Sequence, residues 1–463
     1  MDTIIASWQQ RKWRTMTQRP RFIVVYDLSA AGPAEIVASL AQLGEVTFAV
    51  NPSSFTTPLV PLLRDLADVV MLDEPRALER LRSAHPSGII TFSDRMVRKT
   101  AWLAAELGLP YHSPDTAELL TSKYGQRRRL HGRGVGTART ALLDEPSRWQ
   151  EAVRWIGLPA VLKPVHGEGS RNTYKIEDEQ RGRALVEELL GTDGTPKPRE
   201  TALVLETFID GKDCRPFADY VSVESIVSHG VVSHLGVTGK FLQPPPFREV
   251  GQFWPALLGM DDKHAVLDLT QRAIEALDVR TGVLHTEIKL TDHGPEVIEV
   301  NGRLGGMIDK LCLTATGLDL IELAGRLALG EDVELPELSC SGVTFQHCTL
   351  APTEPCRLDE IHGAARVRRT PAISAYRTRV RPGTELEGGV GTRYLDYLCG
   401  TAANHDAMLA FLDEVLEELS FSFTLPSGRI TRSALSLSGR RPREGSARPE
   451  ETYSDRSSGK GSQ

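Results

Sequence analysis

The sequence predicts a multidomain protein of the α/β and α+β classes, and three observations support this prediction. The chain has 463 residues, too many for one ordinary core. Its composition, 40% hydrophobic and 25% charged residues, is typical of globular proteins. Between residues 21 and 115, short apolar runs alternate with helical stretches, which indicates a parallel sheet covered by helices.

The strands expected in this first unit are "RFIVVYDL", "VTFAV", "DVVML" and "GIITF". The expected helices are "PAEIVASLAQL", a stretch around residues 59–66, and "EPRALERLRSA". The turn after the first strand reads "SAAGP" rather than GxGxxG, so the dinucleotide-binding fingerprint is absent. Ser113, followed by Pro114, predicts the start of a helix that opens the next unit.

The far end of the chain is expected to form a small α+β region over residues 336–430. Its predicted strands are "GVTFQHCTL", "AISAYRTRV" and "TRYLDYLCG", and its predicted helix is "AMLAFLDEVLEEL". Residues 1–20 contain no apolar block of signal-peptide length, and residues 431–463 are polar. We therefore expect a disordered lead over 1–20 and a disordered tail over 431–463.

Composition also excludes several classes of function. The formal net charge is −7 with no long basic face, which argues against a nucleic acid as the main partner. No stretch approaches the ~20 apolar residues of a membrane helix. The six cysteines include no CxxC pair, so neither a zinc site nor a dense disulfide framework is predicted. Free thiols in a reducing cytoplasm are the expectation.

The segment "TEIKLTDHGPEVIEVNGR" predicts a hairpin whose loop is centred on His293. Pairing about this centre gives one polar and one apolar face, as a half-buried antiparallel pair requires. The polar face would pair Glu287 with Glu299, His285 with Asn301 and Lys289 with Val297. The apolar face would pair Ile288 with Ile298 and Thr286 with Val300.

Two carboxylates in directly opposite positions, with Cβ atoms ~5 Å apart, repel each other. A divalent cation between Glu287 and Glu299 would reverse that effect, and Mg²⁺ is commonly bound by one or two carboxylates together with substrate phosphates. Asn301 adds an amide oxygen and Arg303 a fixed positive charge on the same face. The alternative is a solvent-facing hairpin with ordinary surface glutamates.

A second candidate phosphate site follows the apolar strand in "PAVLKPVHGEGSRNTYKI". Lys163 ends this strand, and a flexible loop with Gly167, Gly169 and Ser170 follows. Glycines allow backbone N–H groups to approach anionic oxygens, and lysine supplies a compact charge. The motif GxxxxGK[ST] does not occur, so this is not a Walker A loop. The alternative is a plain hairpin with a glycine-rich turn.

Two further stretches extend this set. Lys123 stands at the start of a predicted helix in "LLTSKYGQRRRL", where a solvated basic helix is the alternative. In "ALVLETFIDGKD" an apolar strand ends at Glu206 and continues through Phe208 to Asp213. The exposed linker after this strand would hold an adenine by its backbone groups, with an acidic residue for the ribose hydroxyls.

These pieces, in this order, resemble the ATP-grasp superfamily. The resemblance covers about residues 21–425, and its most specific part is the E-x11-E-x-N-x-R pattern that ends at Arg303. It implies an ATP-grasp fold with a parallel α/β pre-ATP-grasp domain over 21–115. A central domain over 116–335, made of two subdomains with a lid over about 156–225, would enclose ATP. Residues 336–430 would close the carboxylate site.

Within the superfamily, the sequence looks most like those of L-amino-acid ligases and peptide ligases of secondary metabolism. The similar stretches are "YVSVESIVSHG", "HLGVTGK", "PPFREVGQFWPALL" and "VIEVNGRLGGMIDKL". The resemblance implies that a carboxylate attacks the γ-phosphate of ATP to give an acyl phosphate. An amine then displaces phosphate and leaves an amide. Homodimers are common among such relatives, so a homodimer is suggested by analogy alone.

The resemblance also implies residue roles. Phosphates would be held by Lys123 and Lys163 with Gly167, Gly169 and Ser170. The nucleotide would also meet Glu206 and Phe208, with Asp213 as a ribose candidate. Metal ligands would be Glu287, Glu299 and Asn301, binding two Mg²⁺ with Mn²⁺ as a substitute. Arg303 would stabilise the transferring phosphoryl group, with Lys240 as a further phosphate or acyl contact.

The sequence departs from the family pattern in two places. The stretch "GKDCRPFADYVSVE" is longer than in many relatives, which leaves the ribose ligand open among Asp213, Asp219 and Glu224. The loop after Ser170 reads "RNTY", where relatives often have another glycine. The segment "PPFREVGQFWP" offers possible substrate contacts at Arg248, Glu249 and Trp254.

Two other functions are alternatives to the ligase. A carboxylase of the biotin carboxylase kind shares the carboxylate, amide and arginine spacing, but the chain has no Met-Lys-Met carrier motif. The third hypothesis is a module that binds a nucleotide without catalysing a reaction. The chain keeps every residue expected to bind phosphate or metal, which argues against this hypothesis. The sequence identifies neither the acid nor the amine, nor a general base.

Overall fold

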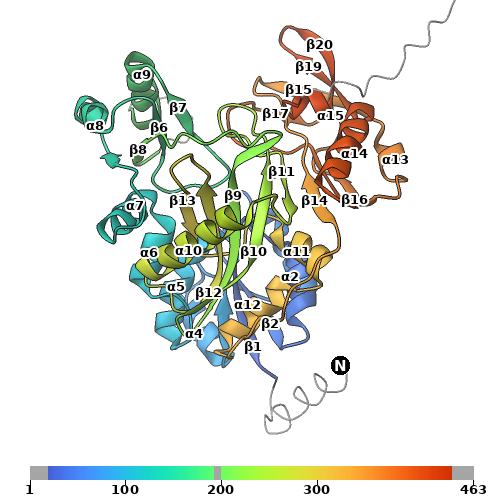
Figure 1. Cartoon of the computed structure of the whole chain (residues 1–463). Helices are drawn as coiled ribbons and strands as arrows, with labels where there is room; N and C mark the ends of the chain where they lie inside the picture. The colour runs from blue at the N-terminus through green and yellow to red at the C-terminus, as the bar shows by residue number, and fades with distance from the viewer. Residues whose placement is uncertain (1–18, 192–199, 441–463) are drawn as a thin grey trace, which may run out of the picture.

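The computed structural model describes residues 19–191 and 200–440. The predicted lead thus lies almost wholly outside the described residues, as does most of the predicted tail. Figure 1 shows the N-terminal domain at the bottom of the molecule, with two lobes standing apart at the upper left and upper right. Among the described residues no helix is both long and apolar enough to cross a membrane.

The first domain is the predicted parallel α/β unit. Its strand order is β3-β2-β1-β4, and each pair is parallel. Helices supply both faces, which is why the strands read as continuous apolar runs. The strands are β1 (Arg21–Tyr26), β2 (Glu45–Val50), β3 (Asp68–Met71) and β4 (Gly88–Ile90). The helices are α2 (Pro33–Leu40), α3 (Val60–Leu66), α4 (Ala77–Ser83) and α5 (Val97–Leu107).

Two short helices connect this domain to the rest, and both begin at a serine cap. Ser113 accepts a hydrogen bond from the Thr116 amide at the start of α6 (Pro114–Thr121), as predicted. Ser122 caps α7 (Lys123–Gly132) in the same way. The second cap fixes where α7 starts and therefore where Lys123 lies.

The lobe at the upper left of Figure 1, called the lid here, contains an antiparallel sheet of order β5-β8-β6-β7. Its strands are β5 (Thr140–Leu143), β6 (Ala160–Pro164), β7 (Tyr174–Ile176) and β8 (Leu203–Thr207). Its helices are α8 (Trp149–Ile156) and α9 (Glu179–Leu190). The predicted lid bounds of about 156–225 are therefore shifted. The lid begins at β5, whose Leu143 joins its core, and ends with β8.

The centre of the molecule is an eight-stranded sheet of order β13-β12-β9-β10-β11-β14-β18-β16. Its central strands are β9 (Phe217–Ser228), β10 (Val231–Phe241), β11 (Gly251–Trp254), β12 (Gly282–Lys289) and β13 (Glu296–Asn301). Three strands of the predicted C-terminal region continue it: β14 (Val343–His347), β16 (Ile373–Thr378) and β18 (Asp396–Ala402). The associated helices are α10 (Met260–Ala276), α11 (Ile308–Thr316) and α12 (Leu320–Ala328). The C-terminal region is thus joined to the centre by one continuous sheet.

The hairpin β12–β13 has the predicted register at its carboxylates and not beyond them. Glu287 pairs with Glu299 and His285 with Asn301, as expected. The register then shifts, so that Ile288 pairs with Val297 rather than with Ile298. One extra residue on β13 makes this irregularity, a bulge that the symmetric pairing rule did not include.

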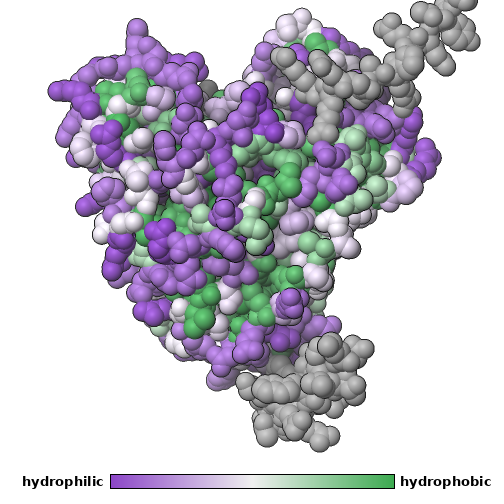
Figure 2. All heavy atoms as spheres, viewed as in Figure 1, coloured by the Kyte–Doolittle hydropathy of each residue, from purple (hydrophilic) through white to green (hydrophobic). Residues whose placement is uncertain are grey.

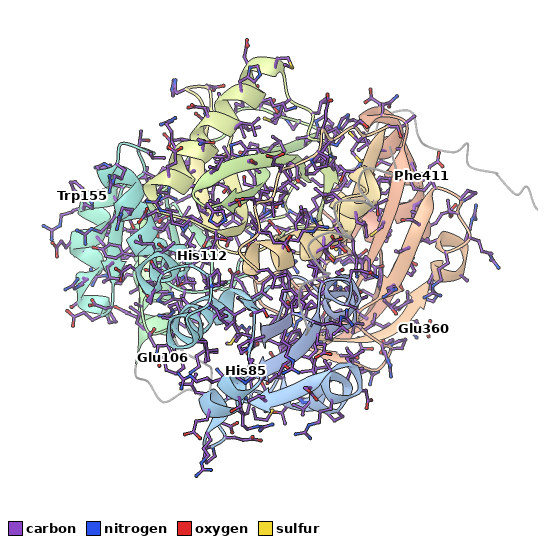
Figure 3. The ribbon with its side chains drawn as sticks, turned by 90° about the horizontal axis from the view of Figure 1, so that it is seen from below. His85, Glu106, His112, Trp155, Glu360 and Phe411 are labelled. Carbon is purple, nitrogen blue, oxygen red and sulfur yellow. The ribbon has the colours of Figure 1, made fainter. Side chains whose placement is uncertain are left out.

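The lobe at the upper right, the C-terminal lobe, adds a small sheet of order β17-β15-β19-β20. Its strands are β15 (Cys356–His362), β17 (Glu385–Leu386), β19 (Ser420–Leu425) and β20 (Gly428–Ser433), and its helices are α13 (Ala364–Val367), α14 (His405–Glu418) and α15 (Ala434–Leu437). The prediction that disorder begins at residue 431 is wrong. Ala434 and Leu435 are buried in the core of this lobe, so the ordered chain continues through α15. In Figure 3, Trp155 of the lid and Phe411 of this lobe lie on opposite sides.

The join between β11, β14 and β18 yields a stability prediction. Phe345 on β14 is fully buried between Phe253 and Gly400, where a Cβ on Gly400 would meet its ring. Phe345→Ala should lower the free energy of unfolding by about 3–5 kcal/mol, because the cavity cannot close between paired strands. Urea denaturation measures this. Leu313→Ala, at a side chain that is 48% exposed, should change it by no more than about 0.5 kcal/mol. If both variants lost the same unfolding free energy, Phe345 would not be the buried core residue described here.

Candidate active site

A cleft of about 450 Å³ lies where the lid, the central sheet and the C-terminal lobe meet. It is lined by residues of the lid (for example Lys163 and Phe208), of the hairpin β12–β13 and of the C-terminal lobe (for example Thr392). Figure 2 shows the surface hollowed between the two upper lobes. Such a concave site between lobes is where small-molecule binding is expected.

A row of polar residues crosses the central sheet at the base of this cleft. Strand register places Glu299, Glu287, Ser222 and Thr238 in one line across β13, β12, β9 and β10. A second line runs through Lys240, Gln252 and Gln346 on β10, β11 and β14. Because residues paired across neighbouring strands share a face, both lines follow from backbone pairing. No single strand sequence reveals them.

The two predicted metal carboxylates share a face of the hairpin and both line the cleft. The Glu287 carboxylate lies 3.7 Å from Nε2 of His285. Burial acts to raise the pKa of Glu287, but His285 and Lys240 outweigh it and lower this pKa to about 2. Glu287 is therefore a carboxylate at neutral pH. The Asn301 amide also lines the cleft and donates to the His285 carbonyl at 3.2 Å.

Glu299 forms an ion pair with Lys123, whose Nζ lies 2.8 Å from the Glu299 carboxylate. The same Nζ donates to the carbonyl of Gly167 at 2.8 Å. Burial acts to lower the pKa of Lys123, but Glu299 outweighs it and the pKa is raised. Lys123 thus stays charged and connects the hairpin to the lid loop.

Lys163 and Glu206 form the next charged group. Lys163 Nζ lies 2.8 Å from the Glu206 carboxylate, and Arg127 donates to both oxygens of that carboxylate at 3.3 and 3.4 Å. Burial acts to raise the pKa of Glu206, whereas Arg127 and Lys163 lower it to about 2. Both oxygens are already bonded, so Glu206 holds the two cations in place.

The two residues predicted to be catalytic line the same cleft. Arg303 pairs with Asp94, which follows β4 in the N-terminal domain, and this contact holds the pKa of Arg303 above its usual value against the opposing effect of burial. Lys240 donates to the side chain of Gln252 at 2.9 Å. Lys240 has no carboxylate partner among the described residues.

The loop with Gly167, Gly169 and Ser170 also lines the cleft. Gly169 has φ +63° and Ser170 has φ +54°. A left-handed conformation suits glycine and is uncommon for serine. The Gly169 carbonyl accepts from the amide of Thr392 at 3.0 Å, so the loop contacts the C-terminal lobe.

A second connection ties this loop to the N-terminal domain. Arg95 donates to Glu168 at 2.7 Å and to Asp27 at 3.4 Å. Burial raises the pKa of Glu168 despite the nearby arginine. Two adjacent residues of the lid loop, Glu168 and Gly169, are thus bonded to the N-terminal domain and to the C-terminal lobe.

Phe208 lines the cleft at the end of β8, with Nζ of Lys175 4.5 Å from its ring centroid. None of the three ribose candidates lines the cleft. Asp213 is exposed and bonded to Arg215, and Asp219 pairs with Lys289 at 2.7 Å. Glu224 is fully buried on β9, beside His285 of the neighbouring strand β12. The cleft lining therefore does not support any of the three as a ribose ligand, because the chain leaves the cleft after Ile209 and Glu224 is buried beside His285.

Glu224 has a different position and a different partner from those expected. Its carboxylate lies 2.9 Å from Nδ1 of His285, which places a buried carboxylate behind the histidine that faces Glu287. His112, in the interior of Figure 3, supports the end of the hairpin. Its Nε2 lies 3.4 Å from the carbonyl of Gly302, between Asn301 and Arg303. Both histidines thus orient residues that line the cleft.

Two of the proposed substrate contacts do not reach the cleft. Arg248 is buried and donates to the carbonyl of Ala351, and Trp254 is packed in the core beside the N-terminal domain. Glu249 does line the cleft, next to Phe247. Arg248 and Glu249 are thus neighbours in the chain, but only Glu249 reaches the cleft.

Several cleft residues were missed from the sequence. Arg127 follows Lys123 by four residues, so a helix places both on one face, and this spacing was a usable signal. Asp94 lies beyond the carboxyl end of a parallel strand, where ligands of open sheets bind. Tyr220, Gln252 and Arg379 gave no such signal, because the long-range order of the central sheet brings them together.

The donor set fits a hard divalent cation better than a soft one. The predicted ligands Glu287, Glu299 and Asn301 offer only oxygen, and no cysteine lines the cleft. Within residues 19–191 and 200–440, no group of three or more His, Cys, Asp or Glu side chains is arranged to hold a metal ion. Ligand phosphates would have to supply the remaining oxygens, as is usual for Mg²⁺.

Comparisons with known proteins agree with the predicted fold. Residues 156–310 match the family model of the ATP-grasp domain, so the chain contains an ATP-grasp domain. The fold is the ATP-grasp fold as well. The structure of an L-amino acid ligase from Bacillus licheniformis superposes with a TM-score of 0.71 at 21% identity, covering 87% of this chain and 98% of that one. Carboxyaminoimidazole ribonucleotide synthase from Aspergillus clavatus, solved with ATP, gives 0.67 at 14% identity, covering 86% of this chain and 98% of that one.

The curated relatives include a ligase and a synthase. Alanine–anticapsin ligase of Bacillus subtilis is 26% identical over 263 residues, which are 54% of this chain and 55% of the relative. Carnosine synthase 1 of Homo sapiens is 27% identical over 311 residues, 62% of this chain and 36% of the relative. The chain thus aligns with about half of the first relative and about a third of the second. It resembles ATP-grasp carboxylate–amine ligases.

The group formed by Glu206, Lys163 and Arg127 yields a pH prediction. Glu206→Gln would leave two buried cations without their anion and should lower the free energy of unfolding by about 3–5 kcal/mol at neutral pH. The pKa of Glu206 is lowered from 4.5 to about 2. Its stabilising effect is therefore complete above pH 4.5 and is lost as the pH falls toward 2.

Urea denaturation of both proteins between pH 7 and pH 3 measures this difference. The difference in unfolding free energy between the wild type and Glu206→Gln should become smaller as the pH falls below 4.5. Asp292→Asn, in the exposed hairpin loop, is the matched control and should show no gap. A difference in unfolding free energy that does not change with pH would contradict the ion pairs of Glu206 with Lys163 and Arg127.

Proposed function

We propose that the protein is an ATP-dependent carboxylate–amine ligase that forms an amide or peptide bond through an acyl phosphate. The observation that carries this proposal is the meeting of two paired carboxylates with Lys123, Lys163 and Arg303 in one cleft. Phosphoryl transfer depends on positioning and charge neutralisation more than on covalent chemistry by side chains. An ATP-grasp domain with these charges meets that need.

In this proposal the nucleotide lies between the lid and the central sheet. Lys123, Lys163 and the loop from Gly167 to Ser170 bind its phosphates. The chain after Glu206, including Phe208, contacts the adenine. No ribose ligand is proposed among Asp213, Asp219 and Glu224, since none of them lines the cleft.

Glu287, Glu299 and Asn301 would hold Mg²⁺, with two ions proposed and Mn²⁺ as a substitute. The bound metal would supply positive charge beside the terminal phosphates. Lys123 pairs with Glu299 at 2.8 Å, so nucleotide binding would redirect this lysine toward phosphate oxygens.

The proposed reaction has two steps. A substrate carboxylate oxygen attacks the γ-phosphorus, the bond from that phosphorus to the bridging β–γ oxygen breaks, and ADP leaves. The amine nitrogen then attacks the acyl carbon, inorganic phosphate leaves with the bonding electrons, and the nitrogen gives up a proton. Arg303 and Lys240 face the developing negative charge. The lid loop, bonded to Thr392, keeps water from the acyl phosphate.

The proposed substrates are amino acids or small peptides, in secondary metabolism. The names of the matched relatives, alanine–anticapsin ligase and carnosine synthase, support this class. A homodimer is proposed by analogy. The six cysteines are free in the structure, which supports a reducing cytoplasm as the location.

The carboxylase alternative shares the fold and has weaker support. A biotin carboxylase structure from Campylobacter jejuni superposes with a TM-score of 0.61 at 15% identity, a likeness of fold. That activity needs bicarbonate and a biotinyl carrier. A module without turnover remains the other alternative, and turnover itself separates it from the ligase.

The paired carboxylates yield a functional prediction. Glu287→Gln or Glu299→Gln should abolish ADP formation, a loss of at least about 100-fold, because each removes a charge that positions the transferring phosphate. A coupled assay for ADP measures this, with circular dichroism to verify the fold. Asp292→Asn in the same hairpin should retain activity. Turnover like that of the wild type in either glutamate variant would refute the metal assignment.

A substrate screen tests the reaction class. Amino acids supplied in pairs should stimulate phosphate release, and mass spectrometry should detect a product with the mass of both substrates less one water. Bicarbonate-dependent phosphate release without an amide product would instead favour the carboxylase.

A further inference from the structure

We propose that Tyr111 and His112 hold buried water behind Arg303 and thereby position this arginine for phosphoryl transfer. The inference rests on the proposed ligase function, in which Arg303 faces the transferring phosphoryl group. It adds a buried hydration site and two positioning residues that do not line the nucleotide cleft.

A second, smaller cavity borders the cleft and has a volume of about 30 Å³. It lies between the end of β4, the start of β12, the turn after β13, the helix α12 and the linker that joins α5 to α6. Arg303 lines both this cavity and the cleft. One water needs about 10–15 Å³ of such volume, so the cavity has room for about two waters and is too small for a nucleotide or an amino acid.

Two residues that line this cavity each have a buried polar atom with no hydrogen-bond partner in the described part of the chain. These atoms are the Tyr111 hydroxyl and Nδ1 of His112. His112 is only 4% exposed, and the two rings are neighbours with centroids 4.6 Å apart. Buried polar groups are nearly always bonded, and ordered water supplies the bond where the protein does not.

The two side chains are chemically complementary to water. Nε2 of His112 lies 3.4 Å from the Gly302 carbonyl, which can only accept, so Nε2 carries the proton and donates. Burial lowers the pKa of His112 to about 4, so the ring is neutral at neutral pH and Nδ1 is an acceptor. Burial, together with Asp94, raises the pKa of Tyr111, so its hydroxyl keeps its proton and donates. Water can accept from Tyr111 and donate to His112.

Glycines at the open end of the hairpin make room for the His112 ring, which Figure 3 shows in the interior of the molecule. A Cβ at Gly302 would lie 3.2 Å from Nε2 of His112, and one at Gly282 would lie 3.0 Å from its Cε1. Such close packing leaves the ring little freedom to move. Nε2 therefore stays beside the Gly302 carbonyl, and Nδ1 keeps a fixed position for a water to bind.

Both residues act on Arg303 from behind, one through the backbone and one through a side chain. His112 bonds to the carbonyl of Gly302, the residue before Arg303. Tyr111 lies near Asp94, whose charge acts on its pKa, and Asp94 is the ion-pair partner of Arg303. The hydrated pair therefore limits where the guanidinium can move. This matters because a misplacement of about 1 Å can lower a rate by about 100-fold.

A plain packing defect is the alternative to a hydration site. Much of the lining is apolar, with Ile89 and Leu327 as examples, and a wholly apolar cavity stays dry. This cavity is not wholly apolar, because Tyr111 and His112 both line it. A dry cavity would leave two buried polar atoms unsatisfied, which is unfavourable.

High-resolution crystal structures of the full chain with ADP and Mg²⁺ test the hydration site without requiring turnover. The wild type should show at least one ordered water within hydrogen-bond distance of Nδ1 of His112. In His112→Leu the Arg303 guanidinium should move by more than about 0.5 Å from its wild-type position. A wild-type cavity without water would overturn the proposal, and so would an Arg303 that keeps its position in His112→Leu.

Steady-state kinetics of ADP formation separates positioning from a purely structural role. His112→Leu should lower kcat by about 10- to 100-fold and change KM for ATP by less than about 2-fold, because Arg303 acts in the transition state. His112→Gln should recover part of kcat, since its amide can still donate to Gly302. His264→Leu, at an exposed residue of α10, should behave as the wild type.

Tyr111→Phe, which removes a single oxygen, is the milder probe and serves if His112→Leu does not fold. It should lower kcat by about 3- to 10-fold, the effect of one lost hydrogen bond. Urea denaturation of the same variants measures their stability. A loss of stability with an unchanged kcat for the folded protein would show a purely structural role and overturn the proposal.

The same experiments separate this inference from the ligase proposal. Absence of ADP formation by the wild type with every substrate pair would count against the ligase function. The crystal structures would still decide whether buried water positions Arg303. Wild-type turnover that the Tyr111 and His112 variants fully retain would support the ligase and overturn the role of these two residues.

Discussion

Electrostatic repulsion between Glu287 and Glu299 is the constraint on which the cleft depends. The two carboxylates are paired across β12 and β13, where like charges weaken a sheet. His285 of the same strand lies 3.7 Å from Glu287, and Glu224 raises the pKa of this histidine against the effect of burial. Lys123 of α7 pairs with Glu299. Each acid therefore has a neighbouring cation before any ligand binds. A polyphosphate with its metal would compete for these same charges, which makes the site responsive to a nucleotide.

The contacts that balance charge also hold the lobes together. Lys123 bonds to both the hairpin and the lid loop, and Arg303 joins the hairpin to Asp94 of the N-terminal domain. The lid loop in turn meets Thr392 of the C-terminal lobe. Opening the lid would break charge-assisted bonds at the phosphate end. In the proposed function, these few side chains would couple nucleotide binding to lobe closure.

The sequence predicted the elements well where their signals are local. Alternating strands and helices of the first domain, the cap at Ser113 and the hairpin carboxylates all depend on neighbours along the chain. The predictions failed where a contact with a distant part of the chain decides where a side chain lies or whether a segment is ordered. Asp213 had the right residue type for ribose, but it bonds to Arg215 outside the cleft. The first residues of the predicted tail, up to α15, are ordered because Leu435 packs in a core that its own segment does not contain.

By itself, the sequence determined which groups carry charge and which strand faces they occupy, because side-chain alternation and helix spacing are properties of a few consecutive residues. It also placed Glu287 opposite Glu299. Only the tertiary structure decided which charges meet. The order of the eight-stranded sheet brings Tyr220 of β9 to Glu249, and it carries the C-terminal lobe to the lid loop. Such pairings join residues far apart in the chain, and their stability comes from burial and charge compensation that no local pattern encodes.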